Sequence, residues 1–105
     1  MSPGKIAAQA GHAYLNTFLH AQKLWPEQAL AYASNPPGTK VCLTGSLNSI
    51  LRAADQCQRA DIPHFLVIDS GCPNFFGGEP TITALGLGPA TKKQVQRITG
   101  RFQLL

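Results

Sequence analysis

Five polar side chains recur near the start of the chain at spacings that would align them on one side of a helix. At about 100° per residue, Lys5, Gln9, His12, Asn16 and His20 fall within an arc of about 80°. Lys5 would lie in the first turn, where the helix dipole and unbonded backbone N–H groups already favour an anion. The stripe indicates either an anion-binding helix end or, more simply, a polar face in contact with solvent.

An acidic residue directly follows an apolar run. The run 64–68 (HFLVI) precedes Asp69, Ser70 and Gly71. Ligands gather at the carboxyl ends of strands in α/β domains, because the loops there fan out over the sheet. Asp69 is therefore a candidate functional residue. The alternative is a turn-forming aspartate that bonds its own backbone.

The three cysteines do not indicate a metal or disulfide site. Cys42, Cys57 and Cys72 are spaced evenly, with no C-x-x-C pair and an odd number of thiols. Cys42 and Cys57 lie in apolar patterns and are expected to be small core residues. Cys72 lies in a loop and could react, but no activating partner stands beside it in the sequence.

Basic residues are concentrated at the end of the chain. Lys92, Lys93, Arg97 and Arg101 lie in the last 16 residues, which contain no acidic residue. This basic segment, residues 92–101, suits a polyanionic partner, although a solvated helix face explains it equally well.

The elements that must position these residues follow from periodicity and from helix start and stop signals. Helices are expected at 3–24, 26–34, 47–60 and 91–99, and strands at 40–44, 64–68 and 81–87, with a short terminal strand within 102–105. The first helix would bury a face opposite the polar stripe, comprising Ile6, Ala7, Ala10, Ala13, Tyr14, Thr17, Phe18, Ala21 and Leu24. The helix at 47–60 would bury Leu47, Ile50, Leu51, Ala54 and Cys57. The continuous apolar run 64–68 is typical of a strand buried on both sides.

Length and composition limit the class of protein. The 105 residues fit one domain, and 44% hydrophobic with 13% charged residues excludes a disordered chain. No apolar run reaches the roughly 20 residues of a membrane span, and the first residues do not resemble a secretory signal. We therefore expect a cytoplasmic α/β domain over residues 1–105, with its sheet covered by helices on both faces.

Three segments, in order and in spacing, resemble one family. Residues 4–13 (GKIAAQAGHA), 68–71 (IDSG) and 83–90 (TALGLGPA) are similar to motifs of the archaeal/eukaryotic-type peptidyl-tRNA hydrolases, and an ITG at 98–100 follows. The resemblance covers nearly the whole chain. It implies a three-layer α/β/α sandwich with a small mixed sheet. It also implies hydrolysis by water of the ester between a peptide and the tRNA 3′ ribose, without a metal or an organic cofactor.

Carried over residue by residue, the resemblance places Lys5, Gln9, His12, Asp69 and Thr83 on functional positions of the family. We predict catalytic roles for Lys5, His12 and Asp69 and substrate-binding roles for Gln9 and Thr83. Ser70, which lies beside Asp69, is also predicted to bind substrate. Lys5 and the helix N-terminus could stabilise the oxyanion or bind the terminal phosphate, and Asp69 could activate water or hold Lys5 or His12 in place. Lys92, Lys93, Arg97 and Arg101 would then contact tRNA phosphates.

The chain departs from the family pattern at two places. Cys72 and Pro73 stand where the family usually has Arg-Thr, and the strand that precedes the first helix in the family is absent, because Met1 falls at its end. The departures keep two alternatives open: a non-catalytic tRNA- or protein-binding module of the same fold, and a hydrolase of another ester or amide. An upstream segment, a partner chain in a homodimer, or a movement of residues 101–105 would be needed to complete the sheet.

Overall fold

The chain is an α/β domain whose elements follow the predicted order. The structure is a computed structural model that describes residues 1–69 and 80–105. Its elements are α1 (Pro3–Leu24), α2 (Pro26–Ala33), β1 (Leu43–Thr44), α3 (Leu47–Arg59), β2 (His64–Asp69), β3 (Thr81–Leu87), α5 (Lys92–Thr99) and β4 (Gln103–Leu104). The helix limits agree with the prediction to within a residue, whereas the strand expected at 40–44 is reduced to two residues.

Local signals in the sequence explain where the helices begin. The Ser2 hydroxyl accepts a hydrogen bond from the Lys5 N–H at the start of α1, and Ser46 serves α3 in the same way. Thr91 and Gln94 form a capping box at the start of α5. Such caps satisfy N–H groups that lack a partner in the first turn, which fixes the first residue of each helix.

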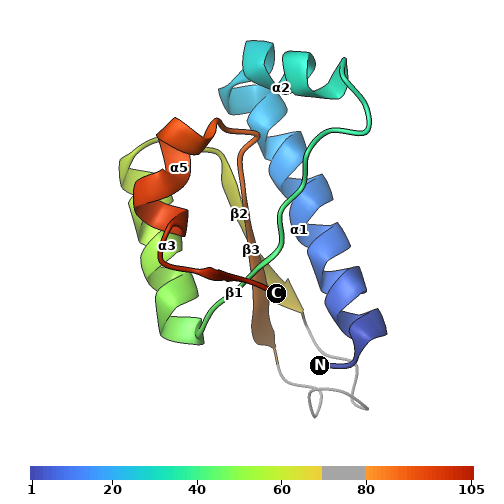
Figure 1. Ribbon diagram of the computed structural model, residues 1–105, viewed down its shortest axis with the longest axis vertical. Helices are drawn as coiled ribbons and strands as arrows, with labels where there is room; N and C mark the ends of the chain where they lie inside the picture. The colour runs from blue at the N-terminus through green and yellow to red at the C-terminus, as the bar shows by residue number, and fades with distance from the viewer. Residues whose placement is uncertain (70–79) are drawn as a thin grey trace.

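The described strands form two separate antiparallel pairs. β2 pairs with β3, and the two-residue strand β1 pairs with β4. In Figure 1 the β2–β3 pair lies between α1 on one side and α3 with α5 on the other. The pairing within the described residues is antiparallel throughout, so the mixed sheet implied by the resemblance is not seen there.

A glycine lets α1 approach the β2–β3 pair closely. A Cβ on Gly86 would collide with the Thr17 hydroxyl and would lie 2.6 Å from the carbonyl oxygen of Ala13. Gly86 therefore faces α1, and the alternation of a strand directs its neighbours Leu85 and Leu87 the other way. Both leucines pack against the core cluster between the strands, α3 and α5, which comprises Ala53, Cys57, Ile62 and Ile98.

Two burial predictions were wrong. Only Val67 is buried in β2, whereas Ile68, which points to the opposite face and does not belong to the core cluster, is 60% exposed. In α3 the fully buried residues are Ala53 and Cys57. Leu47 and Leu51, expected on the inner face, are 52% and 40% exposed, because the core under α3 lies nearer its carboxyl end.

Candidate functional site

The carboxylate of Asp69 brings the first helix and the end of β2 together. Asp69 is the last residue of β2, and its Oδ2 atom lies 3.2 Å from Lys5 Nζ. The same oxygen accepts a hydrogen bond of 2.8 Å from Gln9 Nε2, one turn further along α1. Lys5 and Gln9, which are 64 and 60 positions away from Asp69 in sequence, therefore meet at its carboxylate. This is the strand end where a ligand site was predicted.

Thr83 joins this cluster from β3. Its hydroxyl donates a short hydrogen bond to Gln9 Oε1. Alternation from Gly86, which faces α1, would place Thr83 on the opposite face of the strand. The pairing register shifts here, however: Val67 is opposite Ala84 and Ile68 is opposite Ile82, so Thr83 has no partner in the register.

This register shift is a β-bulge. A bulge contains one extra residue on one strand and changes the side to which nearby side chains point, and bulges are common beside active sites. In β3 the extra residue is Thr83, which consequently reaches α1 instead of the α3 side. The bulge is thus the backbone feature that completes the cluster.

We call Lys5, Gln9, Asp69 and Thr83 the polar cluster, and it is largely shielded from solvent. The exposed fraction of the Lys5 and Asp69 side chains is 14% and 20%, and Gln9 is 2% exposed. The expectation that Gln9 lies on a face opposite the buried one was therefore wrong. The buried residues of α1 are Gln9, Ala13, Thr17 and Ala21, so the helix contacts the strands through a stripe that includes one edge of the polar set. Ala7 and Leu24, predicted to be buried, are exposed.

The rest of the polar stripe does not join the cluster. His12 is exposed, and among the described residues its ring makes no hydrogen bond, although its carbonyl accepts one from Asn16 Nδ2. His20 lies beside His64, with ring centroids 6.4 Å apart. His64 begins β2 and Asp69 ends it, so α1 runs antiparallel to β2 and His20 lies at the end remote from Lys5.

Several candidates from the sequence are not placed by these contacts. Ser70, Cys72 and Pro73 lie outside the described residues.

Cys57 is buried as predicted, and burial raises the pKa of its thiol to about 11. Cys42 is only half-buried and lies near Tyr14, whose pKa is raised by burial and then by the charges of Cys42 and Tyr32. Within residues 1–69 and 80–105, no group of three or more His, Cys, Asp or Glu side chains could hold a metal ion.

The basic segment lies away from the polar cluster. Lys92, Lys93, Arg97 and Arg101 are all exposed, on α5 or just after it. Figure 1 shows α5 on the opposite side of the β2–β3 pair from α1. Arg101 extends towards α3, where its Nη2 atom donates a hydrogen bond of 3.1 Å to Gln56 Oε1.

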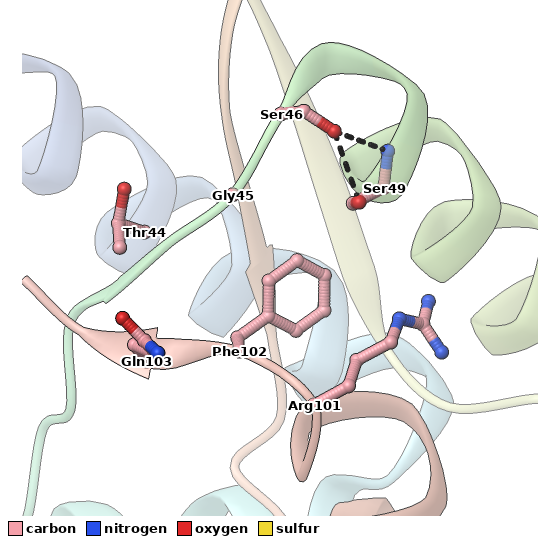
Figure 2. A pocket seen from close by; sticks show the side chains of 7 residues that line it. All are labelled: Thr44, Gly45, Ser46, Ser49, Arg101, Phe102 and Gln103. Carbon is pink, nitrogen blue, oxygen red and sulfur yellow. Dashed lines mark hydrogen bonds between the residues drawn. The ribbon is translucent and has the colours of Figure 1, made fainter.

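Arg101 also lines a hollow that is separate from the polar cluster. The hollow, of about 340 Å³, is lined by Thr44, Gly45, Ser46, Ser49, Arg101, Phe102 and Gln103. In Figure 2 the Phe102 ring lies below Gly45 and the Ser46 hydroxyl points towards Ser49, at the start of α3. No residue of the polar cluster lines this hollow.

None of the helices in the described ranges is both long and apolar enough to cross a membrane.

A lysine, a carboxylate and a buried amide thus lie in contact at the end of a strand in an α/β domain. The family model described as peptidyl-tRNA hydrolase PTH2 matches residues 1–105, so the chain belongs to this family. The peptidyl-tRNA hydrolase of Staphylothermus marinus is 31% identical over 109 residues, covering 100% of this chain and 85% of that protein. That of Methanococcus vannielii is 34% identical over 106 residues, covering 100% and 89%. That of Methanopyrus kandleri is 32% identical over 114 residues, covering 100% and 88%.

Proposed function

We propose that this peptidyl-tRNA hydrolase cleaves the ester between a peptide and the tRNA 3′ ribose by attack of water at the polar cluster. The observation that carries the proposal is the contact of Lys5 and Gln9 with Asp69 at the strand end, in a chain that belongs to the family over its full length. All these residues lie in segments that resemble family motifs.

Lys5 is the residue suited to the negative charge of the transition state. When water attacks the ester carbonyl carbon, the carbonyl oxygen becomes an oxyanion before the ribose oxygen leaves. An ammonium group that is 14% exposed stabilises such a charge more than an ammonium in bulk water does. One donor of this kind is typically worth about 2.7–4 kcal/mol in the transition state.

Asp69 is the residue suited to the proton of the attacking water. Its carboxylate is held by Lys5 and Gln9 but retains 20% exposure, so it is not sealed from solvent. A carboxylate in this setting can orient water and accept its proton. His12 lies three residues after Gln9 and is exposed, so its proposed role is to contact substrate or to transfer a proton at the open side of the cluster. The substrate-binding role proposed for Ser70 concerns a residue outside the described ranges.

Phosphates of the tRNA are the proposed partners of the basic segment. Lys92, Lys93, Arg97 and Arg101 are exposed, and the adjoining helix α3 adds Arg52 and Arg59. Arg59 is partly neutralised by Asp55, 3.0 Å away, whereas Arg101 is held by a neutral glutamine. Contacts to phosphates would be independent of sequence and strongly dependent on salt.

A hydrolysis assay tests the function directly. The purified chain, incubated with N-acetylated aminoacyl-tRNA, should release the acylated amino acid at a rate proportional to enzyme concentration. An Asp69→Asn variant should bind the tRNA but release the product at least tenfold more slowly. Binding of tRNA by the wild-type chain without any release would instead support a non-catalytic module.

For the sheet, we propose that the two strand pairs belong to one mixed sheet in a three-layer α/β/α sandwich, with one further strand between them. In the described structure β1 pairs only with β4, and β3 pairs only with β2. Apolar side chains such as Val41, Leu47 and Leu51 are exposed. The chain covers 85–89% of the three relatives above, so they have residues to form a strand beyond the matched region.

Besides a movement of residues 101–105 into the gap, two sources could supply this strand: a segment outside residues 1–105, which we favour, or a second copy of the chain in a homodimer. Light scattering of the 105-residue chain distinguishes them, because a homodimer doubles the mass. A stable monomer that does not change when an apolar N-terminal segment is added would contradict the proposal. Since peptidyl-tRNA is formed during translation, the cytoplasm is the proposed location.

A further inference from the structure

The side chain of Gln9 is enclosed between two residues of the polar cluster. Its amide nitrogen donates to Asp69 Oδ2 at 2.8 Å, and its carbonyl oxygen accepts from the Thr83 hydroxyl. The whole residue is 2% exposed, and it is one of the largest fully buried side chains. A side chain that binds substrate must present a polar atom to it, whereas both ends of this amide already contact protein groups.

The chemistry of the three groups fixes the direction of the hydrogen bonds. An ionised carboxylate can only accept, so Asp69 requires the NH₂ end of the Gln9 amide. The carbonyl end then faces Thr83, and the threonine hydroxyl must act as the donor. If this donor is removed, the buried carbonyl of Gln9 loses its partner, and the amide is no longer anchored from the β3 side against Asp69.

The backbone supports the same arrangement. Thr83 is the extra residue of the β3 bulge, and only this register shift brings its hydroxyl to the α1 side. The cluster thus joins residues 74 positions apart in sequence through one hydrogen bond. Polar networks buried in this way restrict their members to one orientation when every hydrogen bond is made.

We propose that Gln9 and Thr83 are positioning residues: Thr83 anchors the carbonyl end of the Gln9 amide, and Gln9 in turn holds the Asp69 carboxylate beside Lys5. This inference rests on the proposed function of Asp69 and Lys5. It replaces the substrate-binding role that we predicted from the sequence for Gln9 and Thr83.

The experiment compares two substitutions of Thr83. Thr83→Val keeps the shape of the side chain and removes the donor, whereas Thr83→Ser keeps the hydroxyl. With N-acetylated aminoacyl-tRNA as substrate, kcat of Thr83→Val should fall about 10- to 100-fold, because small displacements of a reacting group are costly. KM should change by less than about threefold, and Thr83→Ser should remain within about threefold of the wild type. A rise in KM at constant kcat would show that Thr83 binds substrate and would overturn the proposal.

Combining substitutions tests whether Thr83 acts through Gln9. Gln9→Leu alone should lower kcat to a similar extent, and Thr83→Val should then add less than about threefold, because the residue through which it acts is gone. Losses in kcat that multiply fully in the double variant would overturn the inference. Thermal unfolding of each variant checks that the fold is retained.

A second measurement does not depend on activity. The side-chain amide protons of Gln9 should exchange slowly with solvent in the wild type and at least tenfold faster in Thr83→Val, while Thr83→Ser stays slow. An inactive wild-type chain with this exchange pattern would refute the proposed function but support the hydrogen-bond relay. An active chain in which Thr83→Val leaves both the exchange and kcat unchanged would refute the relay alone.

Discussion

Replacing Lys5 by methionine removes the ammonium group from the polar cluster with little change in side-chain length. The Lys5–Asp69 pair has a 3.2 Å separation and exposed fractions of 14% and 20%. At an effective dielectric constant of about 20, two unit charges at this distance attract by about 5 kcal/mol before the cost of desolvation. Most of this gross term is offset by desolvation, so we expect the free energy of unfolding to fall by about 1–3 kcal/mol.

The effect on catalysis should be larger than the effect on stability. If Lys5 stabilises the oxyanion, Lys5→Met should lower kcat about 10²- to 10³-fold, which corresponds to about 2.7–4 kcal/mol. The assay is single-turnover release of an N-acetylated amino acid from tRNA, with urea unfolding of the same samples. Lys23→Met is the matched control, because Lys23 is exposed in the last turn of the same helix. The control should change kcat by less than about twofold.

A double-mutant cycle identifies the partner of Lys5. In an Asp69→Asn background the carboxylate charge is already absent, so Lys5→Met should cost little further stability. Turnover of Lys5→Met within twofold of the wild type, in a protein that is still folded, would remove Lys5 from the catalytic residues. An unchanged stability cost in the Asp69→Asn background would show that the ion pair is not what Lys5 contributes.

Three further outcomes concern packing, titration and binding. Gly86→Ala should lower the free energy of unfolding by about 1–3 kcal/mol in urea titrations, because the added Cβ would collide with α1. Thr17→Val should leave the free energy of unfolding unchanged or raise it, because the buried Thr17 hydroxyl has no hydrogen-bond partner in the described structure. Burial raises the pKa of the Cys57 thiol from 9.0 to about 11, so the folded state binds this proton more tightly than the unfolded state. The contribution of this proton to the free energy of unfolding is therefore complete below pH 9. The free energy of unfolding should fall by about 3 kcal/mol between pH 9 and 11, and unfolding curves of Cys57→Ala should lack this fall. The affinity for tRNA should fall steeply with salt, and Lys93→Ala and Arg97→Ala should each reduce the slope of log K against log[salt] by about 0.9 if they contact duplex phosphates; an unchanged slope would exclude them.

Local signals made the elements predictable, and the resemblance named the four residues that the structure brings together, whose roles stay predictions. Ser2, Ser46 and Thr91 mark helix starts because capping depends on residues three positions apart, which a sequence displays directly. The cluster residues Lys5 and Asp69 were both named from the sequence. What could not be read there is the bulge at Thr83, because a register shift depends on two strands at once.

Burial was predicted less well, for a physical reason. Periodicity shows which face of a helix is apolar, but not how far a neighbouring sheet extends over it. Gln9 lies at the edge of the apolar face of α1 and is buried because the end of β2 offers it a carboxylate. Conversely, Leu47 and Ile68 are apolar but exposed, because neither packs against the core cluster.

The order of the elements along the chain has a consequence for the synthesis of the protein. Lys5 and Gln9 are made 60 or more positions before their partner Asp69, and Thr83 follows after that. While the ribosome extends the chain, α1 can form its own hydrogen bonds but has no strand to pack against until β2 and β3 have emerged. Long-range contacts of this kind also slow folding, because a large loop must close before they form. A nascent chain stopped before residue 83 therefore contains the lysine and the carboxylate without the hydroxyl that we propose anchors Gln9 beside them, and activity should arise only late in synthesis.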